Sequence, residues 1–202
     1  MKSDELISRI TNLQSLLVDF MGIERQIFVP DRGRVDRLEN DVEHSYNLAM
    51  IAWYLSQHYP QIDSNKVIKY SLVHDLVEVH AGDSQAIGRT PEQEEAKDKA
   101  EQAAQAKLAS DWSDFGEMNQ FLADYEDQID TEAKFVKALD KLTPTLLNLL
   151  SGGKTWKRYD FKAEQIKANK DEKTKYSPEV FELWSSLRNV IDSHPEYFNP
   201  TS

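Results

Sequence analysis

The residues best suited to chemistry form one short run, Val73-His74-Asp75-Leu76-Val77-Glu78. Its apolar members are typical of a buried helix, where charged groups are costly unless they are paired or bind a metal ion. On a helix, His74 and Asp75 point about 100° apart, so both can reach one ion only if it lies beside their shared edge. Glu78 lies on the same face one turn later. The run therefore predicts a metal site with a further carboxylate beside it.

Two more residues can complete a coordination shell. His44 lies in the first turns of an expected helix over about residues 41–57, and Asp140 lies in an expected helix over about residues 131–152. Two imidazoles and two carboxylates suit one divalent ion of manganese, cobalt, iron, nickel or zinc better than calcium, and magnesium is retained as a candidate. If all four bind one ion with octahedral geometry, two positions stay open for water and a phosphate oxygen.

Each of these residues also has an ordinary structural explanation. A buried histidine such as His44 is more often a hydrogen-bonded core residue than a ligand, and His-Asp pairs recur by chance. Asp140 precedes Lys141 and could be half of a surface salt bridge. The metal interpretation depends on all of them occupying inward-facing positions of separate helices.

The elements that must position these residues are expected to be helices. Only seven glycines and seven prolines interrupt 202 residues, and long stretches have helical rather than alternating spacing. The spacing predicts helices over about residues 4–20, 41–57, 63–81, 90–110, 115–128, 131–152 and 177–193. Residues 22–40 are expected to be an ordered connection, and the basic segment 154–176 a loop or a short helix. No strand is expected, so the predicted class is all-α with a single core of about six to eight helices.

Length and composition indicate one domain spanning residues 1–202, with a core at about 5–150 and a C-terminal extension, 151–202, packing on it. The absence of cysteine excludes disulfides, zinc-thiolate sites and cysteine nucleophiles, and fits a reducing cytosol. The amino terminus has no secretory pattern, and no apolar run approaches the roughly 20 residues of a membrane span. We therefore expect a cytoplasmic protein without a membrane partner.

The formal charge of −11 disfavours a nucleic-acid partner, since such surfaces use Lys and Arg to neutralise phosphates. A small anionic substrate remains compatible with this charge. It would need a metal ion and a few local basic groups to overcome the repulsive field.

At the residues described above, the chain resembles the HD-domain phosphohydrolases, whose pattern is a His, then a His-Asp pair, then a distant Asp. Residues 39–45 and 74–83 resemble the branch that contains bacterial 5′-deoxynucleotidases, which remove phosphate from deoxyribonucleoside 5′-monophosphates. The likeness covers about residues 5–150, and the extended signature His-Asp-x-x-Glu-x-x-x-Gly-Asp is much more specific than His-Asp alone. It implies an HD-domain helical bundle and, since dimers are common in this branch, a homodimer.

The resemblance also implies roles for individual residues. Four of them would be metal ligands: His44, His74, Asp75 and Asp140. Glu78 would be the acid or base that orients the attacking water or protonates the leaving oxygen, and Asp83 would lie near the sugar and leaving group of the substrate. Arg25 occupies about the place of the phosphate-binding arginine. Arg37 and Arg34 remain candidates for that role, because residues 29–34 are longer here than in the family.

These roles make a consistent chemistry for a small phosphate substrate, a nucleotide above all. A metal ion polarises a phosphate oxygen and lowers the pKa of water, a carboxylate handles the proton, and an arginine holds the phosphate. Two alternatives stay open. One is an HD enzyme acting on another phosphomonoester, a nucleoside triphosphate or a phosphodiester, and the other is a non-enzymatic all-α regulator with a structural metal. With five histidines in all, one metal is preferred over two.

Two other features have simpler interpretations. His80 stands where the branch usually has an apolar or aromatic residue, and an outward-facing position is its ordinary explanation. The run Gly152-Gly153-Lys154-Thr155 lacks the first glycine of a nucleotide-binding phosphate loop and follows a helix rather than a strand, so we interpret it as a helix stop.

Overall fold

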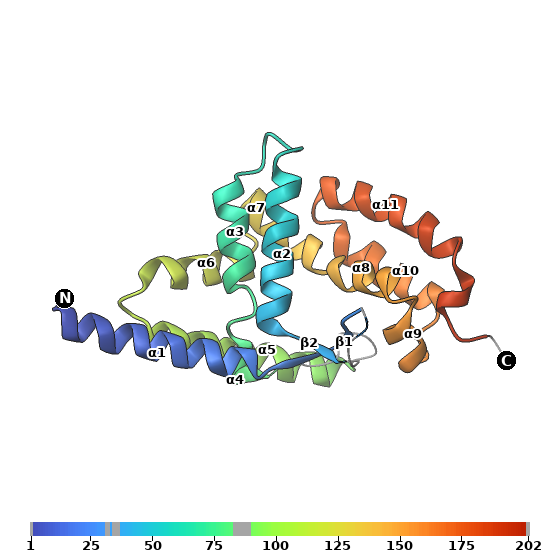
Figure 1. The fold of residues 1–202 in the computed structure, drawn as a ribbon. Coiled ribbons are helices and arrows are strands. Elements are labelled where there is room, and N and C mark those ends of the chain that lie inside the picture. The colour runs from blue at the N-terminus through green and yellow to red at the C-terminus, as the bar shows by residue number, and fades with distance from the viewer. Residues whose placement is uncertain (1, 31–32, 34–36, 83–89, 201–202) are drawn as a thin grey trace.

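The computed structural model describes residues 2–30, 33, 37–82 and 90–200. In this part of the chain the fold is helical with one small two-stranded sheet, which confirms the predicted all-α class (Figure 1). The elements are α1 (Ser3–Met21), β1 (Glu24–Phe28), β2 (Leu38–Asn40), α2 (Asp41–Ser56), α3 (Ser64–Val73), α4 (Glu78–Ala81), α5 (Pro91–Asp111), α6 (Gly116–Glu126), α7 (Thr131–Asp140), α8 (Thr143–Leu150), α9 (Lys154–Arg158), α10 (Ala163–Thr174), α11 (Pro178–Asp192) and a short 3-10 helix, η1 (Pro195–Tyr197).

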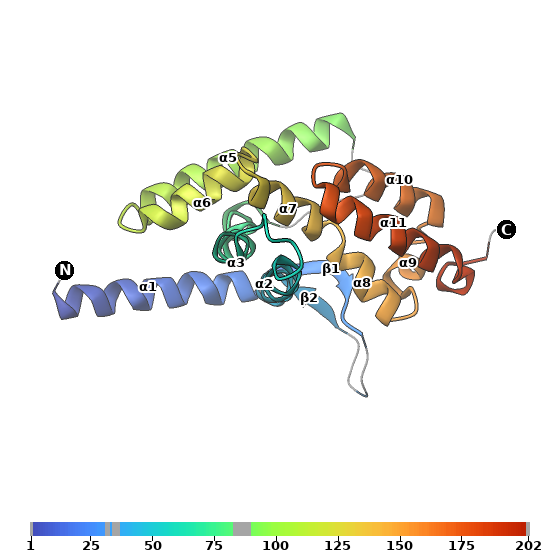
Figure 2. The ribbon, with the colours of Figure 1, turned by 90° about the horizontal axis from the view of Figure 1, so that it is seen from above.

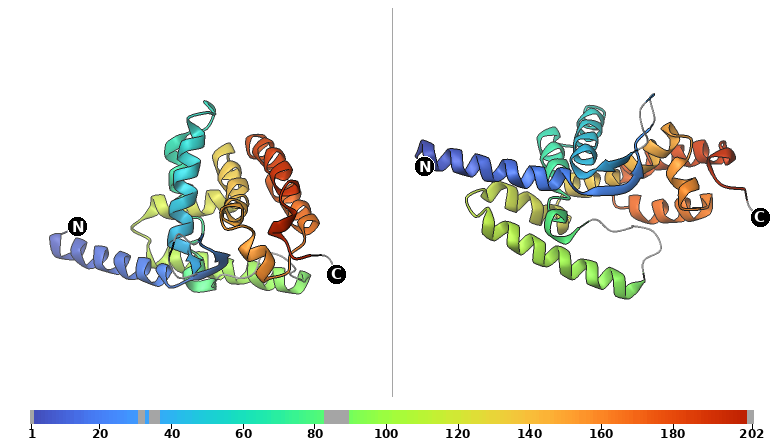
Figure 3. Two further views of the ribbon diagram at one scale, coloured as in Figure 1. Left: turned by 45° about the vertical axis from the view of Figure 1, so that its right-hand side comes forward. Right: turned by 60° about the horizontal axis from the view of Figure 1, so that its bottom comes forward.

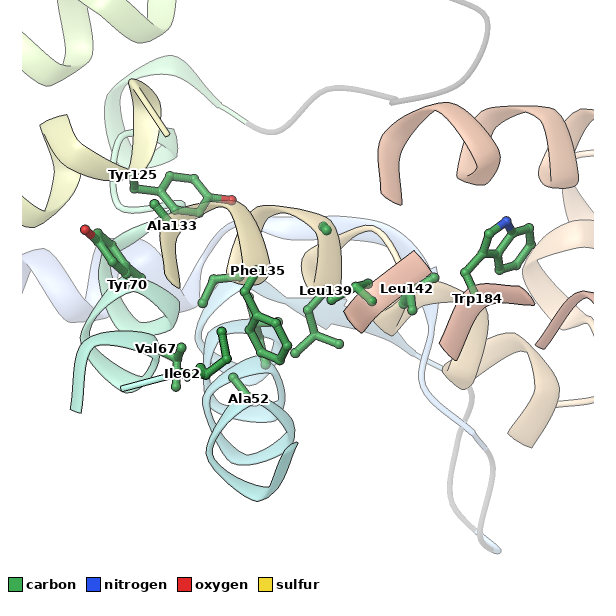
Figure 4. Close-up of a cluster of buried hydrophobic side chains, with 14 of the residues drawn as sticks. Ala52, Ile62, Val67, Tyr70, Tyr125, Ala133, Phe135, Leu139, Leu142 and Trp184 are labelled. Carbon is green, nitrogen blue, oxygen red and sulfur yellow. The ribbon is translucent and has the colours of Figure 1, made fainter. Parts of the chain in front are cut away.

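Three helices form the centre of the molecule. α2 and α3 pack side by side, and α7 contacts both of them (Figures 1 and 2). Their facing sides bury a large apolar cluster, in which Val67, Phe135 and Leu139 are at most 1% exposed (Figure 4). Since each fully buried aliphatic or aromatic side chain contributes about 1.5–3 kcal/mol, this cluster fixes the three helices relative to one another.

Side-chain caps begin five of the helices in the described residues. Asn40 caps α2 by accepting a hydrogen bond from the Glu43 amide, and the Glu43 carboxylate accepts one from the Asn40 amide in return. Asp63, Thr90, Asp130 and Ser177 cap α3, α5, α7 and α11 in the same position. Each cap satisfies an amide that the first turn leaves without a helical partner.

The helix expected over 63–81 is broken, so the prediction of one continuous helix there is wrong. α3 ends at Val73, and the next turn is closed by i→i+3 hydrogen bonds, from the Leu76 amide to the Val73 carbonyl (3.0 Å) and from the Glu78 amide to the Asp75 carbonyl (2.9 Å). Such tight turns eclipse residues three apart. Asp75 and Glu78 are therefore on one side of the chain, while α4 continues beyond them.

The helix expected over 131–152 is also broken, directly after Asp140. Pro144 has no amide hydrogen and cannot bond to the Asp140 carbonyl four residues earlier, so a regular helix cannot pass this point unchanged. The Thr143 hydroxyl donates to that carbonyl instead, at 2.9 Å. The chain then starts afresh as α8.

The expectation that residues 22–40 contain no strand is wrong. β1 and β2 pair antiparallel, with Glu24 opposite Asn40 and Phe28 opposite Leu38. A two-stranded ribbon is marginal by itself, and β1 is held by contacts with α8 and α9. The Phe28 amide, for instance, donates to the Thr155 hydroxyl at 3.0 Å. Support from residues so distant in sequence is invisible to a local pattern.

The C-terminal part of the chain is helical and packs on the centre. The basic segment 154–176 forms α9 and α10 rather than a loop, and both α10 and α11 contact α7 (Figure 2). Gly152 and Gly153 have φ of +67° and +75° and separate α8 from α9, as expected for a helix stop.

The first half of α1 projects from the body of the molecule (Figure 3). Among the apolar residues of α1, Phe20 is buried, whereas Leu6 and Ile10 are 50% and 56% exposed. No helix in the described residues is long and apolar enough to cross a membrane.

Candidate metal centre

Three elements bring the predicted ligands together. His44 stands on α2, His74 and Asp75 follow the end of α3, and Asp140 ends α7. His44 Nε2 lies 2.8 Å from Asp140 Oδ1 and 4.0 Å from Asp75 Oδ2, and His74 Nε2 lies 3.0 Å from Asp75 Oδ2. His44, His74 and Asp75 each offer a donor atom within 4.8 Å of the others. Asp140 joins this group through His44.

This donor set fits a divalent metal ion. Donors that are each about 2.1 Å from one ion are separated by roughly 3–4 Å, which matches the separations observed here. The ring orientation of His74 fits as well. Its Nδ1 donates to the Ser71 carbonyl at 2.9 Å, while the buried Nε2 lies 3.0 Å from Asp75 Oδ2 without the geometry of a hydrogen bond. A histidine anchored in this way presents Nε2 as a ligand atom.

His44 is supported by a carboxylate that the sequence did not single out. Glu39 on β2 is 1% exposed, and its Oε2 lies 3.3 Å from His44 Nδ1. Burial lowers the pKa of His44, but the adjacent Asp140 and Glu39 carboxylates outweigh burial and raise it to about 9. Carboxylates behind metal-binding histidines commonly orient the ring in this way. The signal for Glu39 was its place in the Glu-Asn-Asp-Val-Glu-His run.

Arg25 projects from β1 into the same acidic group. Its Nη1 donates to Asp75 Oδ2 at 2.6 Å and to Asp41 Oδ1 at 2.9 Å. Burial opposes charge on Asp75, yet His74 and Arg25 hold the pKa of this carboxyl well below its usual range. A completely buried Asp41 at the start of α2 is the second acid that sequence reasoning missed as a site residue.

Glu78 completes a second acidic group. Asp41, Asp75 and Glu78 offer oxygens within 4.8 Å of one another, a spacing that could itself hold a cation. Two of these three carboxylates bind the Arg25 guanidinium. The second group is thus already neutralised in part by an arginine.

A pocket of about 630 Å³ opens over these residues. Arg25, His74, Asp75, Glu78 and Asp140 line its floor side by side with the aromatic ring of Tyr125. Other lining residues come from α5, from α7 and the turn after it, and from α10, and they include five lysines: Lys97, Lys137, Lys141, Lys170 and Lys173. The volume is within the range of small-molecule sites.

The remaining predicted residues are placed differently. Arg37 is 52% exposed in its side chain and pairs with both carboxylate oxygens of Glu43 at 2.6 Å, so the geometry gives no support to a phosphate-binding role for it. Asp83 and Arg34 lie outside the described residues. His80 is exposed on α4, in agreement with an outward-facing position.

Sequence comparison places this arrangement in a family. Residues 23–181, which include every ligand candidate, match the model of the HD domain. The chain belongs to the HD-domain family. The expected resemblance is thereby confirmed, and the HD-domain match extends beyond residue 150 to include α10.

Individual relatives agree with this assignment. The HD-domain chain is 28% identical over 130 residues to human 5′-deoxynucleotidase HDDC2, and 30% identical over 131 residues to the Xenopus laevis protein of that name. These matches span 62% of the chain and only 63% and 64% of the two relatives.

Solved structures share the fold. A predicted metal-dependent phosphohydrolase from Magnetospirillum magnetotacticum MS-1 is 26% identical and superposes with a TM-score of 0.76, covering 96% of this chain and 97% of its own. The PH0347 protein from Pyrococcus horikoshii OT3, at 22% identity, superposes with a TM-score of 0.54 over 91% of this chain and 98% of its own, which is a likeness of fold.

Proposed function

We propose that this protein is a metal-dependent phosphohydrolase that releases phosphate from deoxyribonucleoside 5′-monophosphates. The observation that carries the proposal is the convergence of four donor residues, of which His74, Asp75 and Asp140 line one pocket and His44 lies buried behind them. Glu78 and Arg25 line the same pocket. The names of the curated relatives support the nucleotide substrate, and the Magnetospirillum structure supports metal dependence.

The two imidazoles and two carboxylates would hold the ion. When bound, a divalent ion polarises a phosphate oxygen and lowers the pKa of water, which supplies a nucleophile near neutral pH. The residues around it have their own tasks. Arg25 would hold the phosphate with its charged fork, exchanging part of its present contact with Asp41 and Asp75 for phosphate oxygens.

Glu78 is the residue placed to move the proton. It is 6% exposed, lines the pocket and has an oxygen within 4.8 Å of Asp75. A carboxylate at that position can accept a proton from the attacking water or deliver one to the leaving sugar oxygen. The ring of Tyr125, buried against His74 with 5.6 Å between ring centroids, closes the apolar side of the floor.

The decisive experiment measures phosphate release by the metal-reconstituted protein from a panel of deoxyribo- and ribonucleoside 5′-monophosphates. Nucleoside triphosphates, cyclic nucleotides and a generic phosphomonoester are tested in parallel. We expect turnover of the deoxyribonucleotides with the highest kcat/KM. Phosphate release only from triphosphates or cyclic nucleotides would show that the substrate belongs to one of those classes instead. If no compound of the panel released phosphate, the non-enzymatic alternative would be favoured.

A further inference from the structure

The pocket contains a buried lysine that the roles described above do not use. Lys170 stands on α10, is 8% exposed and lines the same pocket as Asp75, Glu78 and Asp140. Its ammonium makes no hydrogen bond and no ion pair with any residue that the structure describes. Taking an ammonium out of water without a counter-charge is costly. An anion bound in the pocket would supply the missing counter-charge.

The other lysines of the pocket differ from Lys170 in this respect. Lys97 pairs with Glu101, Lys137 with Glu126 at 3.3 Å, and Lys141 with Asp140 at 2.6 Å. Their charges are therefore already compensated within the protein. Lys173, three residues further along α10, also lines the pocket without an ion pair among the described residues, but it is only half-buried.

The surroundings of Lys170 place its charge near the candidate metal centre. Burial lowers the pKa of Lys170 most, Lys141 lowers it further, and Asp140 partly restores it, to about 8. Asp140 and Arg25, which also act on this pKa, line the same pocket as Lys170. At neutral pH the side chain still carries a positive charge.

Resting on the proposed function, we infer that Lys170 is a substrate-binding residue that contacts the phosphoryl group from α10, with Lys173 adding charge on the same helix. The phosphate would then lie between a guanidinium from β1 and an ammonium from α10, and it would give Lys170 the counter-charge that the described residues do not supply. α10 would belong to the site rather than merely pack on the core.

The test uses three variants of the manganese-reconstituted protein and inorganic phosphate as the probe. Lys170→Met removes the charge with similar volume, Lys170→Arg keeps it, and Lys175→Met removes a charge from an exposed residue just beyond the same helix. Phosphate affinity is measured by calorimetry, and the melting temperature is measured with and without phosphate.

We expect Lys170→Met to weaken phosphate binding roughly 10- to 100-fold, as loss of a charged hydrogen bond does. In phosphate-free buffer this variant should melt at the same or a higher temperature than the wild type, because an unpaired buried charge has been removed. Lys170→Arg should retain most of the affinity, and Lys175→Met should behave as the wild type.

Unchanged phosphate affinity in Lys170→Met, or a lower melting temperature in phosphate-free buffer, would overturn the inference and make Lys170 a structural residue. Absence of phosphate binding to the wild type would overturn it as well. Phosphate affinity and melting temperature can both be measured even if the protein hydrolyses no substrate. A protein that binds phosphate through Lys170 but hydrolyses no nucleotide would refute the proposed function while leaving this inference standing.

Discussion

At the scale of single residues, Glu78 is expected to be needed for catalysis but not for metal binding. Replacing it by glutamine keeps a polar side chain of the same shape but removes the proton-transfer group. We expect kcat to fall by about 10²- to 10⁴-fold with metal content retained, because Glu78 is not among the four proposed ligands. Phosphate release and bound metal are measured on the same preparation.

The matched control is Glu126→Gln, since Glu126 lines the same pocket but pairs with Lys137 at a distance from the acidic floor. Loss of metal from Glu78→Gln would place Glu78 in the coordination shell and refute the assigned division of roles.

A substitution at Glu39 tests whether His44 must be held in one orientation to bind the metal ion. Glu39 Oε2 lies 3.3 Å from His44 Nδ1. Loss of a carboxylate that orients a metal-binding histidine typically weakens metal binding about 10- to 100-fold, so we expect a loss of this size in Glu39→Gln. Metal affinity is measured by competition with a chelator. Glu24→Gln, on the exposed side of the neighbouring strand, serves as control, and equal affinities for the two variants would exclude the supporting role.

Lys170 also predicts a pH dependence. Its pKa is about 8 in the folded protein and about 10.4 in an unfolded chain. Between these values the unfolded state binds more protons, so folding stability rises with pH. Asp140, Lys141, Lys173 and Arg25 face it, but they are common to the wild type and to Lys170→Met.

The difference in unfolding free energy between these two proteins should therefore change by roughly 3 kcal/mol in favour of the wild type from pH 8 to 10.5. Urea unfolding in phosphate-free buffer measures it. A difference independent of pH would mean that Lys170 is solvated.

At the scale of the elements, the turn between α8 and α9 depends on one glycine. Gly153 has φ of +75°, and a Cβ there would stand 1.9 Å from the Tyr197 carbonyl oxygen. Both the strained backbone and the clash oppose a side chain, so Gly153→Ala should lower the unfolding free energy by more than about 2 kcal/mol.

Gly116→Ala is the control, because a Cβ at the first residue of α6 meets nothing within 4 Å. It should be neutral or stabilise by up to about 1 kcal/mol. Thermal or urea unfolding distinguishes the two variants. Equal stability of both would mean that the connection before η1 is loose enough to move aside.

At the scale of the whole molecule, the metal should tie distant helices together. The ligands come from α2, the end of α3 and α7, so an ion that binds only the folded state stabilises it. At 100 times its dissociation constant this amounts to about 2.7 kcal/mol. Removing metal with a chelator should lower the melting temperature, and adding manganese should restore it.

Asp140→Ala should abolish this metal-dependent rise, whereas Asp83→Ala should keep it. A rise that survives in Asp140→Ala, or that is lost equally in both, would show that the proposed shell is wrong.

The sequence by itself determined the features that depend on local signals. Apolar spacing predicted the helices, and residues such as Asn40 and Asp130 cap them, because the first turn needs such partners wherever it forms. The motifs around His44 and His74-Asp75 resemble the HD-domain family, and this resemblance implied the ligand set that includes Asp140. Pro144 held a further local signal, the break after Asp140, that the prediction of one long helix overlooked.

The tertiary structure decided which groups meet across long separations. That Arg25 binds both Asp41 and Asp75, that Glu39 stands behind His44, and that Lys170 enters the pocket from α10 all depend on how β1, α2, α7 and α10 pack. Side-chain periodicity shows which face of an element is buried but not what it is buried against. The choice of electrostatic partners therefore depended on the assembled core, and with it the completion of the site.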